Sequence, residues 1–222
     1  MAPVDVSLVS RARPVSSRRD QILCVLSPLV PVLPGGGLPR GAVIAVGTGE
    51  GTPVGRGGGG ARTLAFALLA AASATGSWCA AVGTSDPGIL AIAELGVDLD
   101  HLALVPGPGG AWPEVAAILI DDMDVVLVRP PGPVRPGAAR RLAARVRQRG
   151  AVLVVQEGRG TWPEGPDLRL SVEPGPWAGV DRGHGHLRGR HVEVVTGGRR
   201  AAVRSVRTGL WLPAASGAVA AV

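Results

Sequence analysis

The chain has 222 residues, of which 46% are hydrophobic; this is enough for one well-buried domain with appendages and too little for two full domains. Lysine is absent, and the formal net charge of +6 comes from residues 182–222, where seven arginines accompany one acid, Glu193. The uncharged stretch at residues 63–85 is cut by a Thr-Gly-Ser turn signal, so we expect a buried helix and a buried strand there instead of a membrane span.

The first part of the chain predicts an arm, a strand, a loop and a helix, in that order. Residues 1–21 mix Ser, Arg and Pro without periodicity, which predicts a flexible arm, and they lack the apolar run of a signal peptide. After a turn-rich connector, Ala42 to Val46 has the continuous apolar character of a central parallel strand. A glycine-saturated loop follows at 47–60, and residues 62–72 predict a helix.

Strands and helices then alternate up to residue 158. The predicted strands lie at 78–82, 101–105, 124–128 and 151–155, and the predicted helices at 87–95, 112–119 and 137–148. This alternation predicts an α/β core at residues 22–165, with a mostly parallel sheet and helices on both faces. Cys24 and Cys79 lie far apart in apolar runs, which predicts buried free thiols and fits a reducing cytoplasm.

After residue 165 the pattern changes to alternation of apolar and polar residues. It is clearest at 168–173, 186–195 and 202–212, with Gly197-Gly198 as the turn between the last two segments. We therefore expect a basic, antiparallel β extension at 166–213. The small apolar residues at 214–222 predict a disordered tail.

The surplus arginines predict contact with an acidic partner, either protein or nucleic acid, and they are equally consistent with an ordinary solvated β surface. The candidate partner- or DNA-binding residues are Arg140, Arg141 and Arg145 on the outer face of the helix at 137–148, and Arg182, Arg188, Arg190, Arg199, Arg200, Arg204 and Arg207 in the extension. Binding of single-stranded DNA also needs aromatic side chains among the cations. Near the basic segment these are Trp177 and Trp211, so a role in DNA binding has weak support.

Residues 33–64 are arranged like the entrance to a P-loop, in which a lysine holds the β and γ phosphates and a Ser or Thr holds Mg²⁺. In the best register Gly55 and Gly60 are the two spaced glycines, so Ala61 stands at the lysine position and Arg62 at the hydroxyl position. Sliding by one residue lets Arg62-Thr63 imitate Lys-Thr but displaces both glycines. The loop is therefore a degenerate P-loop.

The segments LPGGGLPRGAVIAV, SWCAAV, ELGVDLDHLALV and DVVLV resemble, in order and spacing, the ATPase core of RecA-type recombinases. The segments VEPGPWAGVDRGHGHLRGRHVEVVTGG and LWLP resemble the actinobacterial ImuA-prime proteins, the mycobacterial type of ImuA, and the whole likeness covers residues 22–213. It implies a RecA-like fold and an accessory role in SOS-induced mutagenic translesion synthesis. The implied partners are ImuB, a catalytically inactive Y-family polymerase homologue, and an error-prone C-family polymerase, in the bacterial cytoplasm.

The departures from the recombinase pattern concern the catalytic groups. Arg129 stands where a recombinase has the acidic residue that ends the DVVLV strand, and Asp86 does not match the place of the water-activating glutamate. With the lysine and both acids missing, we expect no ATP hydrolysis, no catalytic residue and no cofactor. The alternative is nucleotide binding, in which the loop presents backbone N–H groups to an anion and Arg62 or Arg129 adds charge.

Two groups of polar residues have a metal-like appearance. Asp121, Asp122 and Asp124 precede their strand and so lie at the edge opposite to the one where α/β sheets bind ligands, which predicts a solvated loop. The histidines at 184, 186 and 191 lack the Cys or carboxylate that completes a zinc site. We expect no metal.

These observations together predict a non-catalytic RecA-like adaptor that binds ImuB through its C-terminal region and its Arg-rich helix. The alternatives are a RecA-like ATPase with an arginine-based phosphate site that acts on single-stranded DNA, and a DNA-binding module whose affinity depends steeply on salt.

Overall fold

The computed structural model describes residues 21–49, 58–158, 160–181, 184–198 and 205–222. The strands are β1 (Ile22–Leu23), β2 (Leu38–Pro39), β3 (Val43–Thr48), β4 (Cys79–Val82), β5 (Leu102–Val105), β6 (Val125–Val128), β7 (Val152–Gln156), β8 (Leu168–Asp181), β9 (His184–Gly197), β10 (Val206–Trp211) and β11 (Ala220–Ala221). The α-helices are α1 (Ala61–Ala74), α2 (Ile89–Glu94), α3 (Trp112–Asp122) and α4 (Pro136–Arg149), and the 3-10 helices are η1 (Ser27–Val32), η2 (Gly58–Gly60), η3 (Leu99–His101) and η4 (Gly109–Ala111). The predicted N-terminal arm lies outside the described residues, which begin at Gln21.

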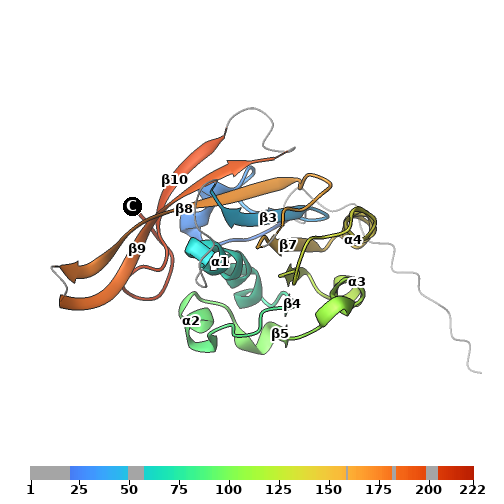
Figure 1. Ribbon diagram of the computed structural model, residues 1–222, viewed down its shortest axis with the longest axis horizontal. Coiled ribbons are helices and arrows are strands. Elements are labelled where there is room, and N and C mark those ends of the chain that lie inside the picture. Colours follow the sequence, from blue (N-terminus) through green and yellow to red (C-terminus); the bar gives the residue numbers. More distant parts are fainter. Residues whose placement is uncertain (1–20, 50–57, 159, 182–183, 199–204) are drawn as a thin grey trace, which may run out of the picture.

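Nine of the described strands form one sheet in the order β11-β10-β9-β8-β3-β7-β6-β4-β5 (Figure 1). The strands from β8 to β5 in this order run parallel, and β9, β10 and β11 continue the sheet in antiparallel pairs. The predicted fold class is therefore confirmed: a mostly parallel α/β sheet extended by antiparallel C-terminal strands.

Different helices cover the two faces of the sheet (Figure 1). On one face α1, α2 and η1 pack against alternate strand residues such as Ile44 and Leu127, and the single phenylalanine, Phe66, is 1% exposed in this cluster. On the other face α3 and α4 contribute Trp112 and Leu142 to a second cluster. Because both faces are covered, the central strands read as uninterrupted apolar runs.

The direction of β8 differs from the prediction. Alternation at 168–173 predicts an antiparallel strand, whereas β8 runs parallel to β3, with Leu168 opposite Ile44. Leu168, Leu170 and Val172 are all 0% exposed, so the alternation correctly reports one buried face. Side-chain alternation carries no information about strand direction. β8 is thus both the last strand of the parallel core and the first of the antiparallel extension.

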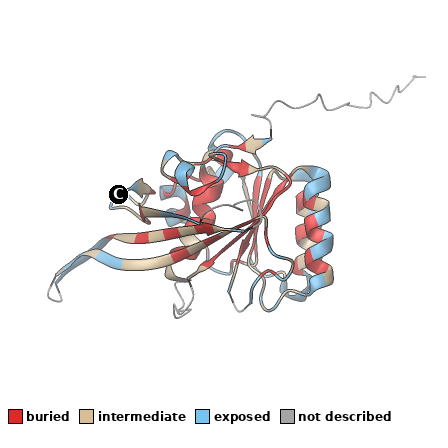
Figure 2. Ribbon diagram, turned by 90° about the horizontal axis from the view of Figure 1, so that it is seen from above, coloured by how far each residue is buried: buried red, intermediate tan, exposed pale blue. Residues whose placement is uncertain are grey.

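β8 and β9, each 14 residues long, pair as a hairpin that projects from the core and becomes exposed toward its far end (Figure 2). β9 then pairs with β10, with Thr196 opposite Val206. The predicted two-residue turn at Gly197-Gly198 is wrong, because the chain continues to Ser205 before it reaches β10.

Two further predictions about burial and order are corrected. The end of the chain is ordered: β11 pairs with β10, and Val219 packs into the core at 7% exposure, so its small apolar residues do not form the predicted disordered tail. Both cysteines are free, but only Cys79 is buried. Cys24 is exposed, with its Sγ 3.4 Å from Thr75 Oγ1, because its neighbours in the chain, Leu23 and Val25, are the residues buried in the core.

Candidate functional site

The carboxyl ends of the parallel strands meet at one edge of the sheet, which is where open α/β sheets bind ligands. Gly49 follows β3 there, Glu157 follows β7, Arg129 follows β6 and Gly83 follows β4. Because α1 comes after the loop that leaves β3, its N-terminus lies at this edge too. The predicted phosphate site is therefore the candidate functional site; Gly55, one of its two glycines, lies outside the described residues.

The end of the glycine loop is packed against the C-terminal strands. Gly60, directly before α1, has a left-handed backbone with φ of 101°. A Cβ at this position would lie 3.2 Å from Val172 Cγ1 and 3.6 Å from Val192 Cγ1. Ala61, at the lysine position, is 2% exposed. Side chains of β8 and β9 thus fill the space beside the start of α1.

Arg62 is turned toward the loop that follows β4. Its guanidinium donates to the backbone carbonyl of Asp86. Burial lowers the pKa of Arg62, the nearby charge of Arg129 lowers it further, and Asp86 acts in the opposite direction. The structure therefore brings together the two arginines that the sequence assigned to this edge, and their charges repel each other.

Three buried polar atoms on elements that reach this edge have no hydrogen-bond partner in the part of the chain that the structure describes. They are Arg62 Nε, Thr84 Oγ1 and Gln156 Oε1. An unsatisfied buried polar group costs about 1–3 kcal/mol, so a bound polar species here would be stabilised. Arg62 and Thr63 also line a cavity of about 260 Å³ against α2 and the C-terminal turn at Pro213.

Two glutamates that sequence reasoning missed lie near the end of β3. Glu157 pairs with Arg169, and Glu173 pairs with Arg207 at 3.0 Å. Glu173 lies against Gly49, where a Cβ would be 3.0 Å from Glu173 Cγ. Because each carboxylate has an arginine partner, these pairs add little net charge at this end of β3. The position of Glu157 directly after a buried strand was the signal available in the sequence.

The candidate arginines of the C-terminal extension divide into three groups. Four lie outside the described residues: Arg182, Arg199, Arg200 and Arg204. Arg207 pairs with Glu193 at 2.7 Å as well as with Glu173, so its charge is compensated. Arg188 and Arg190 lie on the projecting part of β9 and have no carboxylate partner among the described residues.

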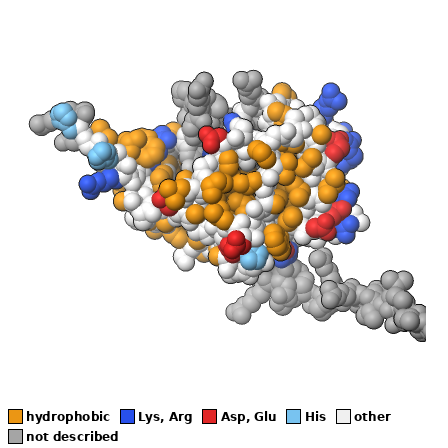
Figure 3. All heavy atoms as spheres, turned by 90° about the horizontal axis from the view of Figure 1, so that it is seen from below, with side chains coloured by type: hydrophobic (Ala, Val, Ile, Leu, Met, Phe, Trp, Pro, Cys, Tyr) orange, Lys and Arg blue, Asp and Glu red, His pale blue; other side chains and the backbone are white. Residues whose placement is uncertain are grey.

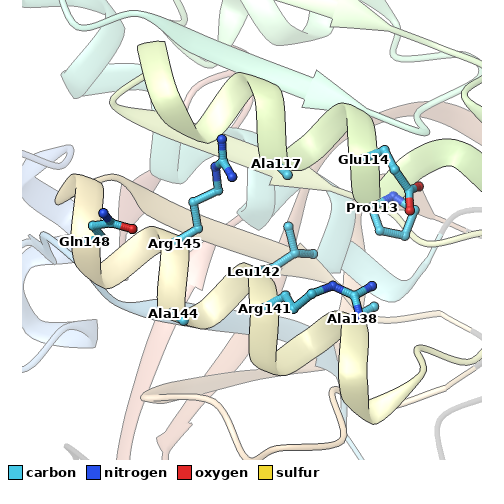
Figure 4. A pocket seen from close by; sticks show the side chains of 9 residues that line it. All are labelled: Pro113, Glu114, Ala117, Ala138, Arg141, Leu142, Ala144, Arg145 and Gln148. Atoms are coloured by element: carbon cyan, nitrogen blue, oxygen red, sulfur yellow. The ribbon is translucent and has the colours of Figure 1, made fainter.

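The candidate arginines of α4 point to different sides of the helix. Arg145 donates to both carboxylate oxygens of Asp121, with Nε 2.7 Å from Oδ1, and Arg140 lies 3.4 Å from Glu164. Arg141 lines a groove of about 390 Å³ between α3 and α4, with Glu114 on the opposite wall (Figure 4). Within the described part of the chain, Arg141 is the member of this group without an ion pair.

The aspartates and histidines with a metal-like spacing have other contacts. Asp121 accepts from Arg145, which lowers its pKa, and Asp124 pairs with Arg40 at 2.8 Å. Asp122 is exposed at the end of α3. Of the histidines, those at 184 and 186 are exposed on the hairpin, and the ring of His191 packs edge-on against Trp211 at 5.9 Å. Among the described residues, no three His, Cys, Asp or Glu side chains form a metal-binding group.

The face at the β5 end of the sheet is apolar. Figure 3 shows hydrophobic side chains gathered in the middle of this face. Large exposed hydrophobic residues on elements at this end include Leu99, Leu104 on the edge strand β5, and Ile118 of α3, which is 65% exposed. Such patches commonly mark protein contacts. Within the described residues, no helix has the length and apolar character needed to cross a membrane.

The fold is RecA-like. The chain superimposes on the crystal structure of the RadB recombinase with a TM-score of 0.59 and 15% identity, over 85% of this chain and 94% of that one. The chain belongs to the family of the MT3502 N-terminal domain, whose model matches residues 31–164.

A mycobacterial relative extends this comparison. The protein Rv3395c of Mycobacterium tuberculosis (strain ATCC 25618 / H37Rv) is 43% identical over 114 residues, which is 51% of this chain and 54% of the relative. The match thus spans about half the length of that protein.

Proposed function

We propose that this protein is a non-catalytic RecA-like accessory factor of DNA-damage-induced (SOS) mutagenic translesion synthesis. It binds an ImuB-like Y-family polymerase homologue and through it supports an error-prone C-family polymerase. The RecA-like fold, the mycobacterial relative and the resemblance of residues 22–213 to the ImuA-prime proteins support this proposal.

Our proposal that the protein does not hydrolyse ATP rests on the charged groups at the candidate site. Phosphoryl transfer uses a cation for the phosphates and carboxylates for Mg²⁺ and water. Here Ala61 is buried at the lysine position, Arg62 donates to the backbone of Asp86, and Arg129 follows β6 where the acid would stand. An arginine cannot replace a carboxylate as a Mg²⁺ ligand, because it offers donors only.

Co-purification with the ImuB-like homologue tests the adaptor role. The full chain should be used, because β9 and β10 contribute buried residues such as Val192 and Leu210, and a chain ending near residue 181 would lose part of its core. We expect the homologue to co-purify, and Arg141→Glu on α4 to reduce its yield. Arg141 has no ion pair to break among the described residues, unlike Arg145.

The control variant is Val30→Asp on η1, an exposed residue outside the apolar face at β5, which should leave this yield unchanged. If the unmodified chain fails to retain the homologue, the adaptor role is wrong. If the homologue is retained and Arg141→Glu does not change the yield, the role stands and the assigned contact is wrong. Release of phosphate from ATP, abolished by Arg62→Ala, would contradict the non-catalytic assignment.

A second candidate function, nucleotide binding without hydrolysis, is favoured by one observation. Arg62 and Arg129 repel each other at the candidate site, and Arg62 Nε and Thr84 Oγ1 are buried without partners within the described residues. A bound anion would relieve both costs. A rise in the melting temperature with ATP or ADP that is lost in Arg62→Ala would support this candidate, and unchanged melting at millimolar nucleotide would remove it.

A further inference from the structure

We use the term arm for the far part of the β8–β9 hairpin, which comprises residues 174–181 and 184–190. It extends beyond the helices that cover the core (Figure 2). Its large apolar side chains are exposed instead of packed: Trp177 is 42% exposed, Val180 45% and Leu187 59%. The arm therefore presents these side chains to solvent instead of to the core of its own chain.

One face of the arm combines an indole ring with cations. Trp177 is directly opposite Arg190 in the β8–β9 pairing, and the Arg190 guanidinium carbon lies 5.4 Å from the centre of the Trp177 ring. Arg190 Nε also donates to the Gly175 carbonyl at 3.2 Å. This second contact holds the guanidinium over the ring, and Trp177 stays 42% exposed beside it.

Arg188 lies two residues before Arg190 on β9, where the β8–β9 register shifts between the pairs Ala178–Gly189 and Val180–Gly185. Gly179 of β8, inside this irregularity, makes room for it: a Cβ at Gly179 would be 2.8 Å from Arg188 Cγ. Gly189, between the two arginines, lies against Pro213, where a Cβ would be 3.1 Å from the Pro213 carbonyl oxygen. The two arginines thus follow each other closely along the projecting part of β9, beside the β8 residues Trp177 and Gly179.

The charges of this face are uncompensated within the described part of the arm. Glu173 and Glu193 lie at its base and both pair with Arg207. No ion pair involves Arg188 or Arg190 among the described residues. A protein partner would be favoured by a continuous apolar surface, whereas here the indole is set among cations and Leu187 alternates with Arg188 along the strand.

An exposed indole beside unpaired arginines is the arrangement that holds single-stranded nucleic acid, in which bases stack on the ring and phosphates contact the cations. We infer that the arm binds single-stranded nucleic acid without sequence preference, with a base on Trp177 and phosphates at Arg188 and Arg190. This site is separate from the glycine loop and from the groove on α4, and it does not depend on the polymerase partner.

Fluorescence anisotropy of the full chain with a labelled oligo(dT) of about 15 nucleotides, within the site sizes of comparable modules, tests the inference. Trp177→Ala should weaken binding by about 5- to 150-fold, the range for loss of one stacked base. Trp177→Phe should restore most of the affinity. Two phosphate contacts predict a slope of about −1.4 for log K against log salt, and Arg188→Ala or Arg190→Ala should each make it shallower by about 0.7.

The matched controls lie at the other end of the sheet and on the opposite helix layer. Trp78→Ala removes an indole of similar exposure, 49%, and Arg135→Ala removes an exposed arginine without an ion pair in the described residues. Neither should change the affinity. The inference is overturned if the oligonucleotide does not bind, if Trp78→Ala weakens binding as much as Trp177→Ala, or if Trp177→Ala reduces only the yield of the co-purified polymerase homologue.

Because the oligonucleotide assay contains no protein partner, its failure leaves the adaptor proposal intact. In the converse outcome the chain fails to co-purify with the polymerase homologue but still binds the oligonucleotide, and the present inference then stands. All five substituted positions are partly or fully exposed, and far-ultraviolet circular dichroism should show that each variant keeps the secondary structure of the parent chain.

Discussion

Alanine substitutions at the two ends of α1 measure how tightly the end of the glycine loop is packed. Gly60 precedes the helix with φ of 101°, and Gly76 follows it with φ of 89°. An alanine in a left-handed backbone costs about 1–2 kcal/mol, partly offset by about 0.4–1 kcal/mol because the unfolded chain also loses freedom. Both substitutions share this net cost of about 1 kcal/mol.

The two sites differ in what the new methyl group meets. At Gly76 it has no atom within 4 Å, whereas at Gly60 it lies 3.2 Å from Val172 and 3.6 Å from Val192. Forcing a methyl group into a packed site costs about 1–3 kcal/mol. We therefore expect Gly76→Ala to lower the free energy of unfolding by about 1 kcal/mol and Gly60→Ala by at least about 2 kcal/mol.

Equilibrium urea unfolding of both variants and the parent chain, with the m-values compared, supplies these free energies. Equal losses for the two variants would refute the reasoning, because they would mean that β8 and β9 do not press on the start of α1. An open loop end is also what a phosphate cradle needs, so that result would strengthen the nucleotide-binding alternative.

Three further predictions concern the core, the thiols and the contact between α3 and α4. Phe66→Ala should lower the free energy of unfolding by about 3–5 kcal/mol and Phe66→Leu by less than about 1.5 kcal/mol, since the ring is 1% exposed; similar losses in urea unfolding would contradict its burial. Burial raises the pKa of the Cys79 thiol to about 12, so a thiol reagent at pH 8 should modify Cys24 rapidly and Cys79 only after unfolding, and two fast equivalents would be the contrary result. Asp121→Asn should destabilise the protein at pH 7, because Arg145 holds the pKa of Asp121 below its unfolded value of about 3.9; the difference should shrink as pH falls through the lowered folded value, and a difference independent of pH would exclude the charge as its cause.

The parallel core was predictable because burial on both faces leaves a direct trace in the sequence. Runs such as those of β6 and β7 are apolar at every position, and helices of suitable length separate them. The direction of β8 left no such trace. Its alternation reports one buried face, while its direction depends on pairing with β3, more than a hundred residues away in the chain.

The candidate site was predictable in its location and not in its contacts. Arg62 and Arg129 could be placed at the carboxyl edge from the order of strands and loops. The acceptor of Arg62 is a backbone carbonyl, at Asp86, which every residue carries and which no sequence pattern marks. The position of Glu173 beside Gly49 likewise follows from the unexpected direction of β8.

β8 connects the edge that holds the glycine loop with the far end of the hairpin in one uninterrupted strand. Its 14 residues, at about 3.3 Å each, span about 46 Å. Its first five residues pair with β3, so the base of the strand is held within the central sheet. The two register shifts of the hairpin, between Pro174 and Trp177 and between Ala178 and Val180, lie beyond this base. Because such irregularities bend a strand and interrupt its hydrogen-bond ladder, we expect the projecting half of the hairpin to bend while its base stays fixed in the sheet. A molecule bound at the tip could then change its position without disturbing the edge that holds the glycine loop.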